Sequence, residues 1–179
     1  VSEELLMNGS MPYSSQEIFR MLQPYGGTVL FGNKDGNLDL TSWVSDEMTA
    51  WSDVGSAQGI TWEMARRGEP AGFGRWAHQF GDPGNTLCSE DQLVKDDFNI
   101  QWVREIAPDK TADRHYVAAS PLVADGKLVN IGRNYISVVN AYNGMPLWDR
   151  DMERIVRMVA PMDAPMICLD DDKLYLSSS

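Results

Sequence analysis

The sequence predicts a chain of mixed α and β structure, in which an α/β part precedes an antiparallel β part. Residues 1–68 alternate helix-like and strand-like apolar patterns, and residues 69–97 are rich in Gly, Pro, Asn and Asp. Residues 98–179 hold short apolar runs between turn residues. Such a change in apolar spacing marks a change of fold class. We therefore expect a first domain that ends at residue 68, a connecting segment, and a second domain from residue 98.

The first domain begins with a predicted helix and a predicted strand. Ser14 stands three residues before Glu17, which is the spacing of a capping box at a helix start. Pro24 ends this helix, because proline cannot continue the hydrogen-bond ladder. Residues 28–32, TVLFG, are a short β-prone run of the kind that is covered on both faces.

A second helix and a second strand are predicted to follow. Apolar residues recur at helical spacing from Leu40 to Trp51, and Gly55 stands where a C-terminal cap is expected. Residues 60–67, ITWEMARR, are typical of a strand. The first domain is thus predicted to run helix, strand, helix, strand.

The second domain predicts short strands joined by tight turns. Asp125-Gly126 and Asn143-Gly144 are turn signals between apolar runs. The runs are residues 98–106, 118–124, 127–132, 135–140, 145–152, 165–169 and 173–178.

These runs contain an internal repeat. Trp102 and Trp148 begin similar segments 46 residues apart, and Lys127-Leu128 and Lys173-Leu174 are also 46 residues apart. A period of about 40–50 residues with four strands per unit is typical of a β-propeller blade. Residues 118–152 supply four such runs and therefore predict one complete blade.

The stretch VVNAYNGMPLW resembles the A-x-D-A-x-T-G-x-x-x-W repeat of the pyrroloquinoline-quinone-type (quinoprotein-like) β-propellers. The motif positions are filled by Asn140, Ala141, Asn143, Gly144 and Trp148, and Trp102 stands one period earlier. In that family the Trp docks one blade on the next, so the resemblance implies a structural motif. The residue chemistry agrees, because Gly tolerates a positive φ, Asn binds turn backbone, and Trp offers an apolar face with one N–H donor.

The resemblance covers residues 76–179. The stretch from Trp76 to Val94 resembles the segment that leads into the first blade, and residues 98–102 would be a lone first strand. The implied fold is an incomplete antiparallel β-propeller, with this strand, one four-stranded blade and the start of the next. Its partners would be the remaining blades and the upstream α/β domain of the parent chain, with a protein or small-molecule ligand also possible.

The segment EIFRMLQPYGG, residues 17–27, is similar to the E-x-x-R-x-L-x-P-G-G segment of class I S-adenosylmethionine-dependent methyltransferases. Tyr25 is an insertion relative to that pattern. The Gly-rich cofactor loop of the family is not found in residues 1–68, so these residues would be only the C-terminal remnant of such a Rossmann-like α/β domain. The two resemblances together are typical of bacterial multidomain proteins.

Three functions stay open for the parent protein. The first is binding or scaffolding by the propeller, the second is a methyltransferase, and the third is a quinone-dependent dehydrogenase. Quinone chemistry in the family uses pyrroloquinoline quinone and Ca²⁺, yet this chain lacks the adjacent cysteine pair that many members carry. We expect no cofactor, no catalytic residue and no activity in this chain itself. Either cofactor would belong to the full-length parent.

Two histidines are candidate polar sites. Asp113, Arg114 and His115 are consecutive, so that the carboxylate could orient the imidazole, although backbone contacts in a loop are the expected role. His78 is expected to pack between aromatic neighbours. No third ligand at metal spacing accompanies either histidine, and Asp170, Asp171 and Asp172 lack the pattern of a calcium loop.

Composition restricts the partners. With 15 Lys and Arg against 26 Asp and Glu, the net charge of −11 disfavours nucleic acid. Cys88 and Cys168 are too far apart for a redox or zinc motif, and no apolar run is long enough to cross a membrane. Val1 at the start and the serine run at the end predict a fragment. The family resemblance favours a periplasmic or other extracytoplasmic location.

Overall fold

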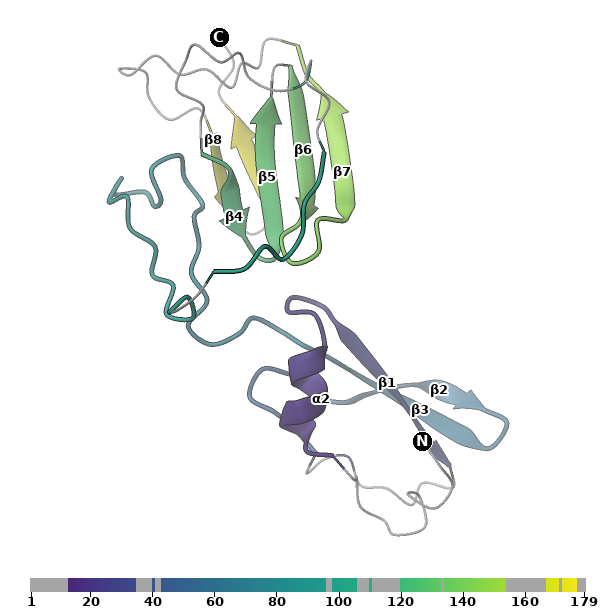
Figure 1. The fold of residues 1–179 in the computed structure, drawn as a ribbon. Helices are drawn as coiled ribbons and strands as arrows, with labels where there is room; N and C mark the ends of the chain where they lie inside the picture. The colour runs from purple at the N-terminus through teal and green to yellow at the C-terminus, as the bar shows by residue number, and fades with distance from the viewer. Residues whose placement is uncertain are drawn as a thin grey trace. The chain divides into compact units, whose positions relative to one another are not determined.

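The computed structural model describes residues 13–34, 40, 43–95, 98–105, 110, 120–132, 134–153, 167–170 and 172–176. It divides into two compact units, Val1–Ala71 and Gly72–Ser179 (Figure 1). Within the described ranges the chain has one short helix and nine strands, and every hydrogen-bonded strand pair is antiparallel. These strands form three sheets, none of which closes on itself in the described part of the chain.

The first unit contains the predicted helix and strand at the expected positions. Helix α2 spans Ser15–Met21, and the side chain of Ser14 accepts a hydrogen bond from the backbone N–H of Glu17 at 3.2 Å. That bond satisfies a backbone donor of the first turn, which has no partner within the helix. Strand β1 follows at Thr28–Lys34. The turn between them holds Tyr25, with φ 56°, in a left-handed conformation.

Strands β2, Ser52–Ala57, and β3, Ile60–Arg66, complete the sheet of the first unit. The strand order is β1-β3-β2, and β3 is antiparallel to both neighbours. The two-residue turn at Gln58-Gly59 has φ of 55° and 74°, which suits a hairpin turn of type I′. Neighbouring strands of this sheet are thus antiparallel, whereas neighbouring strands of a doubly wound sheet are mostly parallel. In mixed sheets, however, an antiparallel strand can lie between two strands that are parallel to each other.

The second helix predicted for residues 40–51 is wrong, because its described residues are irregular. The indole N–H of Trp43 donates to the carbonyl of Tyr13 at 2.9 Å, and that of Trp51 donates to the carbonyl of Trp43 at 3.0 Å. The two indoles stack with centroids 5.8 Å apart. The apolar spacing thus reflects tryptophans that anchor a loop. Gly55 is a bulge residue inside β2, with φ 132°, and not a helix cap.

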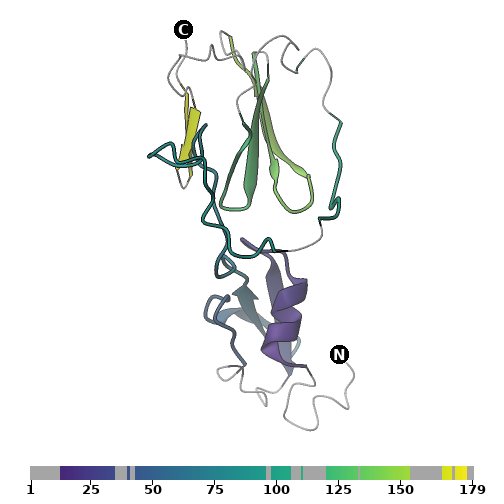
Figure 2. The same ribbon diagram turned by 60° about the vertical axis from the view of Figure 1, so that its left-hand side comes forward.

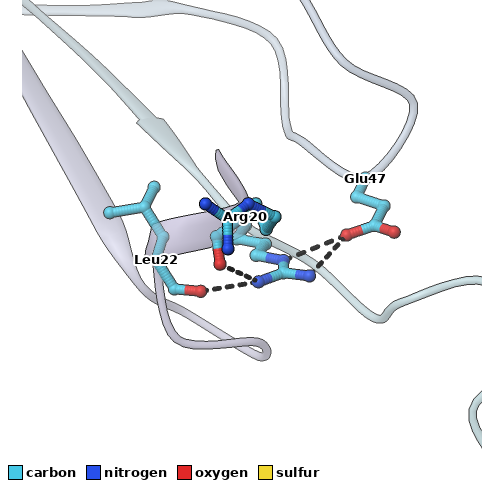
Figure 3. A network of polar contacts seen from close by, with 4 residues as sticks. Arg20, Leu22 and Glu47 are labelled. Atoms are coloured by element: carbon cyan, nitrogen blue, oxygen red, sulfur yellow. Dashed lines mark hydrogen bonds and ion pairs between the residues drawn. The ribbon is translucent and has the colours of Figure 1, made fainter. Parts of the chain in front are cut away.

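A network around Arg67 ties this loop to the end of α2. The Nε and Nη2 atoms of Arg67 lie 3.0 and 2.9 Å from Oε2 of Glu47. Its Nη1 donates to the carbonyls of Arg20 and Leu22 at 3.2 and 2.7 Å (Figure 3). These carbonyls lie at the helix C-terminus, where backbone acceptors lack helical partners. One guanidinium therefore satisfies three acceptor groups from two segments.

The second unit contains a four-stranded sheet whose strands follow one another in sequence order. Its strands are β4 (Leu122–Ala124), β5 (Lys127–Gly132), β6 (Tyr135–Asn140) and β7 (Pro146–Asp151). These are the four strands predicted between residues 118 and 152. The predicted turn at Asp125-Gly126 has φ of 49° and 70°, as a type I′ hairpin requires. Residues 98–105, which include the predicted lone strand, pair with no described strand.

A two-stranded hairpin packs against one face of this sheet. Strands β8, Ile167–Asp170, and β9, Lys173–Leu176, form it, and Figure 2 shows it as a separate layer beside the β4–β7 sheet. Apolar side chains from both layers fill the space between them. The buried cluster consists of Leu122, Ala124, Val129, Ile131, Ile136, Val138, Ile167 and Leu169.

Within the described residues, no helix is long and apolar enough to span a membrane.

Candidate functional site

The candidate site is the loop between β6 and β7 together with Trp102. The indole N–H of Trp102 donates to the carbonyl of Ala141 at 2.9 Å. The ring lies against Gly144, where an added Cβ would come within 2.5 to 3.0 Å of three ring carbons. Gly144 also has φ 69°, a conformation that L residues adopt only with strain. Glycine is therefore required at this position for two separate reasons.

The loop is held in shape by its own asparagines. Oδ1 of Asn140 accepts from the backbone N–H of Tyr142 at 2.9 Å, and Oδ1 of Asn143 accepts from that of Met145 at 3.0 Å. The backbone N–H of Gly144 donates to the carbonyl of Asn140 at 2.9 Å. These Asx contacts fix the shape of the loop locally. The carbonyl of Ala141 is thereby presented to Trp102.

Further contacts hold the loop on the rest of the unit. The ring of Tyr142 lies against that of Phe73, with centroids 5.8 Å apart and a tilt of 41°. The backbone N–H of Ala141 donates to the carbonyl of Gly126, in the neighbouring hairpin turn, at 2.8 Å. Sequence reasoning missed Phe73, because a single aromatic in a Gly-rich stretch gives no periodic signal.

Trp148 lies apart from this site. It is paired with Val138 across the β6–β7 ladder, and its side chain is 45% exposed. Every residue of β7 is exposed. The structure therefore brings together Trp102, Asn140, Ala141, Asn143 and Gly144, and it leaves Trp148 on an open edge strand.

The segment Trp76–His78 is a second feature that the sequence did not reveal. Trp76 and Val123 exchange two backbone hydrogen bonds, of 2.7 and 2.9 Å, at the edge of β4 that faces away from β5. Ala77 accepts from the backbone N–H of Leu169 on β8 at 2.8 Å, and His78 pairs with Cys168. We call residues 76–78 the edge clip, because they cover the first strand of both sheets. So short a run has no strand-like pattern of its own.

Two carboxylates, those of Asp82 and Asp91, accept hydrogen bonds within the loop that surrounds the edge clip. Asp91 accepts hydrogen bonds from the backbone N–H groups of Gly74, Leu93 and Val94, each at 2.9 Å. These bonds, that of Gly74 foremost, lower the pKa of the Asp91 carboxyl below its ordinary value. Hydrogen bonds from Thr86 lower the pKa of the Asp82 carboxyl in the same way.

The remaining candidates do not assemble into a chemical centre. Asp113, Arg114 and His115 lie outside the described residues, as does Asp171. Among the described residues, no three His, Cys, Asp or Glu side chains come together in a way that could hold a metal. Cys88 and Cys168 are both free thiols. The described site therefore offers packing contacts and hydrogen bonds.

Comparison of the chain with protein-family models, with curated proteins and with solved structures finds no match in any of the three.

Proposed function

We propose that residues 76–179 are the beginning of a quinoprotein-like β-propeller that serves as a binding or scaffold module. The observation that carries the proposal is the docking of Trp102 on the loop between β6 and β7. An indole that covers Gly144 and donates to a loop carbonyl is the contact that the repeat motif implies between neighbouring blades. Trp148 stands one period later, on an exposed strand where an equivalent contact has room to form.

The layered packing of the two sheets adds support. The β4–β7 sheet packs through an apolar face on the β8–β9 hairpin, and the repeat places that hairpin at the start of the next unit. In repeat folds each unit buries its apolar face against its neighbour. Successive blades would account for both the 46-residue period and the two layers.

A binding role, and not a catalytic one, is proposed because the described surfaces are built for packing. Strand β7 and the loop before it expose large apolar side chains. These are Met145 at 62%, Leu147 at 51% and Trp148 at 45%. Exposed large apolar side chains of this kind are available for contact with another surface. We assign this surface to the remaining blades of the parent chain.

Calorimetry with the two cofactors of the rival functions tests the proposal. Pyrroloquinoline quinone and S-adenosylmethionine are each titrated into the chain at neutral pH, the quinone with and without Ca²⁺. We expect no saturable heat at micromolar concentrations of either compound. Saturable binding of the quinone would replace the scaffold proposal with the oxidoreductase, and saturable binding of S-adenosylmethionine would replace it with the methyltransferase.

The methyltransferase alternative rests on the first unit. Helix α2, the turn at Pro24–Gly27 and strand β1 follow one another in the order that the resemblance implies. Tyr25, the insertion relative to the family segment, is accommodated by its left-handed conformation. We propose this unit as the C-terminal remnant of a Rossmann-like domain. Its residues do not include the Gly-rich loop that holds the cofactor in that family, so no methyl-transfer step is derived from them.

A further inference from the structure

The first unit contains a hollow of about 240 Å³ between helix α2 and the loop that carries Glu47. The Arg67 guanidinium forms one wall, but it is already engaged by Glu47 and by two backbone carbonyls. The charges of Arg67 and Glu47 thus neutralise each other. The groups that remain available to a ligand come from α2 on one side and from residues 45–46 on the other.

Two opposite charges line this hollow without meeting. Arg20 of α2 and Asp46 of the loop both line it, and both residues are exposed. In the part of the chain that the structure describes, neither side chain forms an ion pair or a hydrogen bond, with the other or with any third residue. The hollow therefore offers a free cation and a free anion.

We propose that this hollow binds a small zwitterion that carries one carboxylate and one ammonium group. The carboxylate would bind the Arg20 guanidinium, whose planar fork matches carboxylate geometry, and the ammonium would bind Asp46. A simple anion would pair with Arg20 but also meet the like charge of Asp46, and a simple cation would pair with Asp46 but also meet the like charge of Arg20. The Ser45 hydroxyl and the Gln16 amide also line the hollow and can hydrogen-bond the ligand.

Size and exposure set the ligand class and the affinity range. Sites for drug-sized molecules occupy about 300–1,000 Å³, so a hollow of about 240 Å³ suits a molecule of a few heavy atoms. Exposed ion pairs contribute little to affinity, because solvent screens both charges. The expected dissociation constant is therefore in the millimolar range. The site lies wholly within Val1–Ala71 and does not depend on the propeller proposal.

Amide chemical-shift titration of the isotope-labelled chain tests the inference. The probes are L-alanine, β-alanine and γ-aminobutyrate, which carry the two charges at increasing separation. Propionate and propylamine carry one charge each and serve as controls, all at matched pH and ionic strength. We expect at least one zwitterion to cause saturable shifts at α2 and residues 45–47, with shifts from the single-charge probes at least tenfold weaker.

Substitutions in the hollow complete the test. Arg20→Gln and Asp46→Asn should each weaken binding of the zwitterion at least fivefold. Neither exposed side chain has a partner in the described structure, so the fold should be retained, which the amide spectrum itself will show. Arg66→Gln and Glu69→Gln change exposed charges outside the hollow and should leave binding unchanged. The inference is overturned if no zwitterion saturates by about 50 mM, if a single-charge probe binds equally well, or if both hollow variants bind normally.

Discussion

The indole ring of Trp102 covers Gly144 so closely that no side chain fits between them, since a Cβ there would lie 2.5 Å from ring atom Cε3. Gly144→Ala should therefore destabilise the second unit for two reasons. The left-handed backbone costs about 1–2 kcal/mol for an L residue, and the steric overlap adds about 1–3 kcal/mol. Urea denaturation of the chain measures the sum.

The same substitution in a Trp102→Ala background isolates the steric part. Once the indole is absent, Gly144→Ala should cost only the backbone term of about 1–2 kcal/mol. Equal costs in the two backgrounds would show that Trp102 does not lie on Gly144 in solution.

Trp102→Phe removes the indole N–H but keeps a ring. The carbonyl of Ala141 then loses its donor, and we expect a loss of about 0.5–1.5 kcal/mol in the free energy of unfolding. Trp148→Phe is the matched control, because that ring is 45% exposed and should change stability by less than about 0.5 kcal/mol. Denaturation followed by far-ultraviolet circular dichroism avoids reliance on the altered fluorescence. A larger effect at Trp148 than at Trp102 would contradict the docking geometry.

Arg67→Lys should destabilise the first unit by about 2 kcal/mol, since a single ammonium cannot reproduce the fork that binds Glu47 and two helix-terminal carbonyls. Arg66→Lys is the control on the same strand, because the side chain of Arg66 is exposed. It should change stability by less than about 0.5 kcal/mol. Thermal unfolding of both variants measures the difference in stability. If the two variants lose similar stability, the Arg67 network does not stabilise the first unit.

Acid should destabilise the loop whose backbone N–H groups bind the Asp91 carboxylate. The pKa of this carboxyl is lower in the folded chain than its unfolded value of about 3.8. Its contribution to stability is therefore fully present above that value and is lost as pH falls through the lower, folded pKa. Amide exchange and chemical shifts of Gly74, Leu93 and Val94 should change together below about pH 4.

Asp91→Asn should abolish this acid transition, whereas Glu90→Gln changes the exposed neighbouring carboxyl and should leave it intact. A transition that persists in Asp91→Asn would assign the acid sensitivity to another group.

Among the described residues no strand pairs with the outer edge of β7. This edge should make the chain associate with itself, because an unpaired strand edge is a template for another strand. Leu147→Lys places a charge on this strand, where the native side chain is 51% exposed. We expect sedimentation velocity to show less concentration-dependent association for this variant, with unchanged stability. Leu93→Lys, in a loop of the same unit where the native residue is 50% exposed, is the control for added charge alone. An equal reduction by both variants would point to net charge and not to the β7 edge.

Most strands of the two units could be predicted from local pattern, since short β-prone runs end at turn residues that accept left-handed backbone. Strand β2, Ser52–Ala57, could not, because its Ser, Asp, Gly and Ala residues give no apolar alternation. Asp125-Gly126 illustrates this, because the dipeptide specifies its own hairpin. The region from Leu40 to Trp51 misled the prediction, because apolar residues at helical spacing also arise when tryptophans fold over a sheet. There the indole N–H bonds of Trp43 and Trp51 replace helical ones, and such long-range bonds leave no periodic signal.

The candidate site was predictable only in part. The loop residues Asn140, Asn143 and Gly144 follow from turn chemistry, which acts between near neighbours. The position of Trp102 on that loop follows from the repeat but not from any local rule. The edge clip could not be found at all, because its pairing partners on β4 and β8 lie far along the chain.

That separation bears on the order in which the second unit folds. Ala77 is hydrogen-bonded to Leu169 of β8, and Trp76 to Val123 of β4. The edge clip can therefore be fixed only after both sheets have formed. Contacts between such distant residues are slow to form, because the intervening chain must first be ordered. During synthesis residues 76–78 leave the ribosome long before β8 exists. We therefore expect the earliest-made segment of this unit to be the last to acquire protection from hydrogen exchange, and folding of the unit to finish only after its C-terminal hairpin has been released.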